Sequence, residues 1–232
     1  MILGLVFLVA LFGGEDDTTT SSPSGNQEQA ESKKEAKQEE KKAAPVEEPD
    51  PINLSGPGQM ATSPFQLESG LAVFSVSYQG DRNFIANLLG QNGADAGRGA
   101  LANEIGSFQG SKAIQTRAGE HLLDVQASGP WTITIEQPRP SSAPQTTSFS
   151  GNSQSATDLF ELSKGRKTFS MTHQGDRNFI VNLLDKNGAD AGRGALVNEI
   201  GPFNGSKAIQ IPQDDIYLLQ VQASGPWSIT VE

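Results

Sequence analysis

The sequence predicts an all-β protein made of two tandem small β-sandwich or jelly-roll domains, and three observations support this prediction. The chain repeats itself, because QGDRNFI occurs at Gln79–Ile85 and at Gln174–Ile180, and NGADAGRGAL begins at Asn92 and again at Asn187. Valine, isoleucine, leucine and phenylalanine fall in short runs separated by Gly, Asn and Asp, without a sustained helical period. Asn-Gly pairs, which favour tight hairpin turns, stand between these runs.

The repeated unit defines the domain organisation. The offset between the copies is 95 residues and becomes 96 where IPQDDIY carries one residue more than TRAGEH. A single insertion at a polar turn, with both flanks in register, indicates a folding unit that was duplicated whole. We therefore expect one sandwich at residues 54–136 and another at 149–232. The proline-containing segment 137–148 is expected to be a stiff linker between them.

The N-terminus predicts export. Residues 1–14 carry an apolar run of twelve residues, which as a helix would reach about 18 Å against the roughly 30 Å of a membrane core. Three interpretations remain open: a membrane anchor whose upstream part is missing, a secretory signal peptide, or a structural segment. Either of the first two places the domains outside the cytoplasm, as a membrane-anchored or secreted protein.

Residues 15–53 hold eleven acidic residues and five lysines and almost no large apolar side chain. Such a tract cannot bury enough surface to offset its ordering entropy, so we predict a disordered spacer. A segment that itself binds a partner is the alternative. Because most of the net charge of -10 belongs to this tract and the chain has no basic stripe, nucleic acid is not an expected partner.

Comparing the two copies predicts which face of a strand is buried. In RKTFSMTH of the second copy, Phe169 and Met171 alternate with polar residues and are expected to point inward. The matching residues of the first copy, Phe74 and Val76, should point inward as well. The first copy reads LAVFSVSY, which is apolar on both faces and ambiguous by itself.

Several segments of each copy resemble the bacterial pre-peptidase C-terminal family of jelly rolls. The first copy shows FQLESGLAVFSV, NFIANLLGQNG and AGEHLLDV followed by WTITIE, which together cover the repeat nearly end to end. This resemblance implies a non-catalytic module that is appended to exported proteins and used for surface or ligand binding. The family usually alternates acidic and apolar residues where this chain has Asn83-Phe84-Ile85.

The residues argue against an enzyme. Cysteine is absent, which excludes disulfides, thiolate metal sites and a cysteine nucleophile. His121 aligns with Tyr217, and His173 aligns with Tyr78, so neither position needs an imidazole. The sequence contains no HExxH, GxSxG or phosphate-binding GxxxxGK motif. We expect no catalytic residues and no obligatory cofactor.

Carboxylates that recur in both copies could form a calcium site. Asp81, Asp95, Asp176 and Asp190 stand near asparagines and glycines, and calcium prefers such oxygen ligands. The alternative is that these residues cap turns, as Asp beside Gly often does. Arg98 lies three residues after Asp95, and a loop ion pair is expected there.

Two pairs of matching residues are candidates for ligand contact. Trp131 and Trp227 lead alternating strands and are expected in the core, with a sugar-stacking platform as the alternative. Asn87 and Asn182 lie on the face opposite the inward residues, where they are either buried and hydrogen-bonded or part of an exposed patch with apolar neighbours.

The function predicted from the sequence is a non-enzymatic, membrane-tethered extracytoplasmic protein that binds a cell-envelope ligand, either a glycan or a surface protein. Duplicated domains suit weak sites that combine by avidity. Two alternatives remain: a purely structural envelope spacer without a discrete ligand, and an accessory or inhibitor domain for a separate exported hydrolase.

Overall fold

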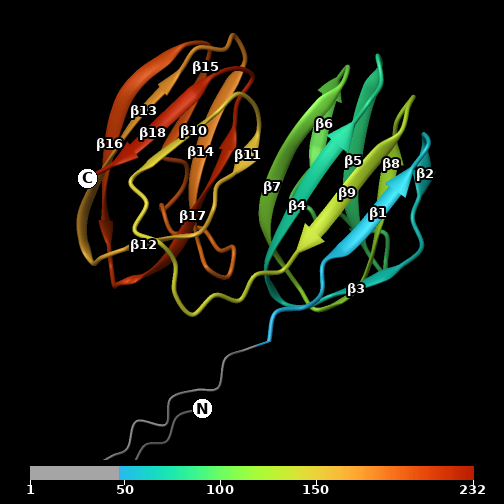
Figure 1. Cartoon of the computed structure of the whole chain (residues 1–232), viewed down its shortest axis with the longest axis horizontal. Coiled ribbons are helices and arrows are strands. Elements are labelled where there is room, and N and C mark those ends of the chain that lie inside the picture. Colours follow the sequence, from blue (N-terminus) through green and yellow to red (C-terminus); the bar gives the residue numbers. More distant parts are fainter. Residues whose placement is uncertain (1–46) are drawn as a thin grey trace, which may run out of the picture. The chain divides into compact units, whose positions relative to one another are not determined.

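The computed structural model describes residues 47–232, which fold into strands, turns and loops (Figure 1). The predicted hydrophobic segment 1–14 and most of the predicted spacer 15–53 lie outside the described residues. Residues 47–232 contain no helix that is long and apolar enough to cross a membrane. Both repeats belong to one compact unit.

The first repeat is a jelly roll of two facing sheets. One sheet has the order β1-β9-β4-β7 and the other has the order β2-β8-β5-β6, with β3 also paired to β8 (Figure 1). These two strand orders are those of a jelly roll, in which most connections cross from one sheet to the other. The strands are β1 (Ile52–Gly56), β2 (Met60–Ala61), β3 (Phe65–Leu67), β4 (Gly70–Tyr78), β5 (Asn83–Gly90), β6 (Ala102–Ile105), β7 (Phe108–Thr116), β8 (Gly119–Gln126) and β9 (Trp131–Glu136).

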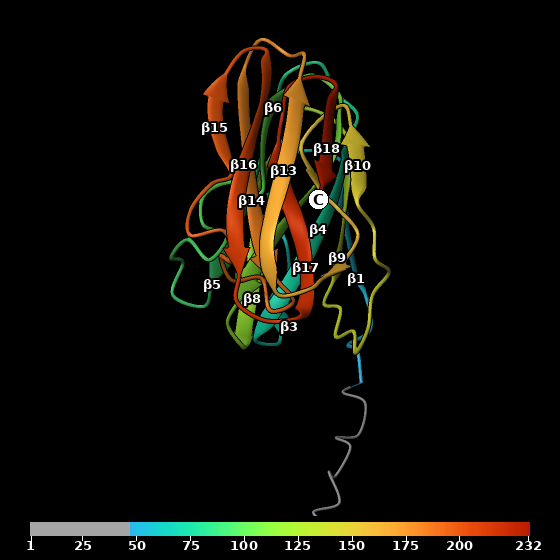
Figure 2. The same ribbon diagram turned by 90° about the vertical axis from the view of Figure 1, so that its left-hand side faces the viewer.

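The second repeat has the same topology. Its sheets have the orders β10-β18-β13-β16 and β11-β17-β14-β15, with β12 also paired to β17. Figure 2 shows the strands β10, β18, β13 and β16 of the first sheet side by side. The strands are β10 (Ser148–Gly151), β11 (Ser155–Ala156), β12 (Phe160–Leu162), β13 (Gly165–His173), β14 (Asn178–Asp185), β15 (Val197–Ile200), β16 (Phe203–Ile211), β17 (Asp215–Gln222) and β18 (Trp227–Val231). The predicted class, all-β with two tandem jelly rolls, is confirmed.

Each sandwich has its own apolar core. The two main core clusters of the described chain are each built from residues of a single repeat. Phe74 and Val76 of β4 are 0% and 2% exposed, and Phe169 and Met171 of β13 are 0% and 1% exposed. The prediction of the inward face, made by comparing the copies, is therefore confirmed.

The duplicated QGDRNFI forms the corner between β4 and β5 and between β13 and β14. The aromatic ring that ends each preceding strand folds over the glycine, so that a Cβ on Gly80 or Gly175 would clash with Tyr78 or His173. Tyr78 then stacks on Phe84, the phenylalanine of the motif, with ring centroids 4.6 Å apart. The motif recurs because the corner needs this glycine and this core phenylalanine.

The repeats also contact each other, through a third apolar cluster. Leu71 and Ala113 of the first repeat lie with Leu184 and Leu218 of the second, and all four are at most 7% exposed. Leu71 stands on the outer face of β4. The ambiguous pattern of LAVFSVSY therefore has a physical cause: its outer face is covered by the second repeat, whereas the matching face of β13 carries polar residues and is not.

Candidate functional site

A polar cleft of about 920 Å³ lies at one end of the first repeat. Its walls come from the loops after β5 and β7 and from the start of β8, and Asn187 of the second repeat completes it. The side chains that offer hydrogen bonds or charge include Asn92, Arg98, Gln115, Arg117, Glu120 and Asn187. The volume is that of a typical ligand site, and the mixed polar lining suits a ligand rich in hydroxyl or charged groups.

The loop that presents Arg98 is held by Asp95. The Asp95 carboxylate accepts the backbone N–H of Gly97 at 3.0 Å and that of Gly99 at 2.8 Å. Arg98, between them, has φ of 53°, in the left-handed region that few non-glycine residues adopt. Its Nη2 donates to Gln115 Oε1 at 3.3 Å, within the cleft. The turn thus fixes the arginine backbone and leaves its guanidinium exposed.

Lys112 of β7 supports the same loop from beneath. Its Nζ donates to the carbonyl oxygens of Gly97, Arg98, Gly99 and Ala100 at 2.8 to 3.4 Å. Burial lowers the pKa of Lys112, and the nearby Asp95 carboxylate opposes this shift. The half-buried lysine thus pairs with the carbonyls of the loop that forms part of the cleft wall.

The predicted calcium residues do not come together. Asp190 repeats the Asp95 geometry, with its two oxygens accepting the N–H groups of Gly192 and Gly194 at 3.1 and 2.7 Å. Asp81 and Asp176 are exposed on the QGDRNFI corners. Among residues 47–232, no group of three or more His, Asp or Glu side chains is placed to hold a metal ion. The geometry of Asp95 and Asp190 is that of turn capping.

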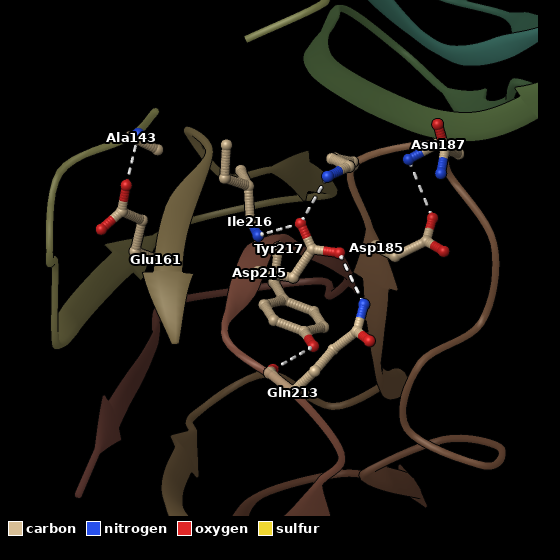
Figure 3. A network of polar contacts seen from close by, with 9 residues as sticks. Ala143, Glu161, Asp185, Asn187, Gln213, Asp215, Ile216 and Tyr217 are labelled. Atoms are coloured by element: carbon tan, nitrogen blue, oxygen red, sulfur yellow. Dashed lines mark hydrogen bonds and ion pairs between the residues drawn. The ribbon is translucent and has the colours of Figure 1, made fainter. Parts of the chain in front are cut away.

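The expected ion pair between Asp95 and Arg98 is not formed, because the carboxylate is turned toward backbone amides. The salt bridge found in the described residues is instead Lys186 to Asp215, at 2.7 Å. It belongs to a polar network of the second repeat in which Asp215 also accepts the N–H of Ile216 at 2.9 Å (Figure 3). Burial raises the pKa of Asp215, but the hydrogen bonds from Lys186 and Ile216 outweigh it and the net pKa is lowered.

Trp131 and Trp227 are core residues, as the alternation predicted. They are 2% and 4% exposed, and each indole Nε1 donates to a backbone carbonyl, of Gly58 at 2.8 Å and of Ser153 at 2.9 Å. An indole buried in this way has no free face for a pyranose ring. The sugar-stacking alternative is wrong for these two residues.

Asn87 and Asn182 lie on outer faces, away from the core of each sandwich, and both are half-buried. Their surroundings differ between the copies. Around Asn182, Leu184 is 7% exposed because the first repeat covers that face. Around Asn87, the matching Leu89 is only half-buried, so the face is open. Neither asparagine lines the polar cleft.

Both histidines have structural surroundings. His121 Nδ1 donates to the Gly119 carbonyl at 2.9 Å, and His173 Nδ1 donates to the Gly201 carbonyl at 2.8 Å. His173 Nε2 is buried without a hydrogen-bond partner. In the first repeat, the longer Tyr78 reaches Ser128 Oγ at 2.7 Å from the same position.

An exposed isoleucine occupies the same position in both copies. Ile105 ends β6 and Ile200 ends β15. Their side chains are 71% and 80% exposed, and they are the two exposed large apolar residues of the described chain. Both β6 and β15 are edge strands. Each repeat thus presents one exposed isoleucine, and the two positions are equivalent.

Comparisons with known proteins give similarity only to solved structures. No protein-family profile matches the sequence, and no curated protein matches it. The tandem CBM22-1 and CBM22-2 domain of Xyn10C from Paenibacillus barcinonensis is 9% identical, with a TM-score of 0.24, over 78% of this chain and 86% of that one. The PBSX exported protein XepA is 10% identical, with a TM-score of 0.25, over 78% and 85%. Both similarities are too distant to bear on function, and membership of the pre-peptidase C-terminal family stays a prediction.

Proposed function

We propose that this chain is a non-enzymatic, extracytoplasmic protein that binds a glycan of the cell envelope in the polar cleft of its first repeat, and that its N-terminus tethers it to the membrane. The observation that carries the proposal is the cleft itself. It offers amide, guanidinium and carboxylate groups from Asn92, Gln115, Arg98 and Glu120, which match the hydroxyl groups of a sugar chain.

The surroundings of His121 and Asp95 support binding rather than reaction in the cleft. His121 is the histidine of the cleft, and it is 6% exposed with Nδ1 engaged by the backbone. Asp95 is engaged by two backbone amides. Both side chains thus commit a polar atom to the backbone and hold the local fold of the cleft, which supports a binding role.

A binding screen of residues 47–232 against purified envelope glycans, with calcium and with chelator, tests this proposal. Saturable binding is the expected result. Binding that requires calcium would mean that Asp95 leaves its turn geometry and acts as a ligand. No saturable binding in either condition would overturn the glycan proposal and favour the structural spacer.

A protein ligand is the second candidate, favoured by the matched Ile105 and Ile200. Two exposed isoleucines on one compact unit suit a partner that has two weak binding sites. Binding at both sites at once would raise the overall affinity through avidity. If this is correct, Ile105→Asp and Ile200→Asp should each weaken binding to protease-sensitive envelope material, and the double variant should abolish it. An accessory role toward a hydrolase would require that the captured protein be such an enzyme.

A further inference from the structure

The contact between the repeats is asymmetric: an edge of one sandwich packs on a face of the other. β7 is the edge strand of its sheet, and its outward N–H groups meet the second repeat. Ser111 N–H donates to the Gln154 carbonyl at 3.2 Å, and Ala113 N–H donates to Gln220 Oε1. Ala156 N–H donates to Ser111 Oγ at 2.8 Å. We call the β7 side the edge surface and the side made by β11, β14 and β17 the face surface.

Because the repeats share one fold, each surface has a free counterpart elsewhere in the same chain. The second repeat has its own edge surface on β16, where Ser206, Lys207 and Ala208 are exposed. The first repeat has its own face surface on β2, β5 and β8, where Leu89 and Leu122 are half-buried. Their counterparts in the contact, Leu184 and Leu218, are 7% and 0% exposed.

The groups that form the contact recur on the free surfaces. Ser206 and Ala208 match Ser111 and Ala113 on the edge surface. On the face surface, Gln59, Ala61, Leu89 and Leu122 match Gln154, Ala156, Leu184 and Leu218. Gly93 matches Gly188, which packs so closely on β7 that a Cβ there would lie 2.8 Å from the backbone of Ile114 and Gln115. An edge strand left open is a template for pairing with another chain.

Some residues of the free surfaces differ from those of the internal contact, and these differences give the two free surfaces opposite charges. Asp124 replaces Gln220, and a carboxylate accepts a backbone N–H at least as well as an amide oxygen. Arg166 replaces Leu71 on the opposite surface, so the free edge gains a positive charge and the free face a negative one. The loss of the Leu71 side chain lowers the apolar area, so contact between these surfaces would be weaker than the contact within the chain.

We propose that copies of the chain bind one another head to tail, with the β16 edge of one copy packing on the β2, β5 and β8 face of the next. The occupant of each free surface is a second copy of this chain, which repeats between molecules the contact that joins the two repeats within one. Such a contact is heterologous, because it joins two different surfaces. An assembly of copies therefore keeps one free edge surface at one end and one free face surface at the other, and further copies can add there.

A pair of charges that flanks the internal contact supports the same partner. Burial raises the pKa of Glu104 on β6, and the positive charge of Arg177 from the second repeat opposes this shift, which places the two side chains within electrostatic reach. Their counterparts on the free surfaces are Glu199 and Arg82, both exposed. In the head-to-tail contact, Glu199 of one copy faces Arg82 of the next.

Sedimentation velocity of residues 47–232 over a range of concentrations tests the proposal without any ligand, so its outcome is independent of glycan binding. The wild type should shift reversibly from monomer to dimer and longer species, and salt should weaken this shift. Glu199→Arg and Arg82→Glu should each weaken association by about tenfold or more. Asp50→Arg, at an exposed residue before β1 on the far edge of the sheet from β7, is the matched control and should associate like the wild type.

An equimolar mixture of Glu199→Arg and Arg82→Glu should restore association, because each contact in an alternating chain then pairs opposite charges. A wild type that stays monomeric at every concentration would overturn the proposal. Association that neither charge reversal weakens, or that the mixture fails to restore, would also overturn it, because it would use another surface.

Because the chain has no cysteine, a disulfide offers a second measurement. Ser111→Cys with Ala156→Cys should form a bridge within one chain, since Ala156 N–H lies 2.8 Å from Ser111 Oγ. Ser206→Cys with Ala61→Cys should instead link separate chains into a ladder under oxidising conditions. The absence of this ladder, when the internal bridge forms, would contradict the proposed register.

Discussion

Leu71→Arg is expected to weaken the contact between the two repeats and so to lower the free energy of unfolding. Leu71 is 0% exposed in the cluster with Ala113, Leu184 and Leu218. Burial of a leucine side chain contributes about 1.5 to 3 kcal/mol, and the substitution removes this contribution. It also brings a second guanidinium near Arg139, whose Nη1 donates to the Leu71 carbonyl at 3.0 Å. We therefore expect a total loss of about 2 to 4 kcal/mol.

The assay is urea unfolding of residues 47–232, followed by circular dichroism and by fluorescence of Trp131 and Trp227, one in each repeat. The variant should unfold at lower urea than the wild type. Arg166→Leu is the matched control, because Arg166 occupies the same position in the second repeat and is exposed, so it should change stability by no more than about 0.5 kcal/mol. If Leu71→Arg behaved like this control, the contact between the repeats would not stabilise the chain.

Two further predictions use differences between the copies, and a third concerns the ion pair of Lys186 with Asp215. Lys112→Met leaves several carbonyls unpaired and should cost about 1.5 to 3 kcal/mol, whereas Lys207→Met, whose lysine meets one carbonyl, should cost less than about 1 kcal/mol in the same urea assay. His173→Tyr should raise stability by up to about 1 kcal/mol, because a tyrosine there could reach Ser224 as Tyr78 reaches Ser128; a loss would contradict this. Asp215→Asn should cost at most about 1 kcal/mol at pH 7, since solvent screens the pair. Because the pKa of Asp215 is lowered below 3.8 in the folded state, its contribution exists above about pH 4 and should vanish as the pH falls through that pKa; a pH-independent difference would contradict the assignment.

Much of the fold could be predicted because duplication gives two versions of each strand. Phe74 and Phe169, at one position of the two copies, are apolar in both and lie in the core. On the outer face of β4, an apolar residue that the second copy lacks marks a surface that something outside the sandwich covers. Leu71 and Arg166 were such a pair, and the difference between them was the available sign of contact between the repeats. The sequence pattern by itself is ambiguous at these positions, because the period of a strand does not show what covers its outer face.

The candidate site was harder to predict. Asn92, Gln115 and Asn187 lie far apart in the sequence and meet only because loops of two sandwiches converge. The recurring Asp95 and Asp190 fit a metal site by residue type, but a carboxylate that accepts the N–H two residues later is also what a capped turn requires. Composition cannot separate these roles, since both use the same carboxylate; the direction in which its oxygens point decides between them.

The measurement that tests the proposed function most directly is the affinity of an envelope glycan for the wild type, Arg98→Ala and Arg193→Ala, at protein concentrations where the chain is monomeric. Arg193 has the same motif and a similar φ of 57°, but only Arg98 lines the cleft. We predict that Arg98→Ala weakens binding by about tenfold or more while Arg193→Ala binds like the wild type. Equal effects of the two substitutions, or none from Arg98→Ala, would place binding outside the cleft and contradict the proposal.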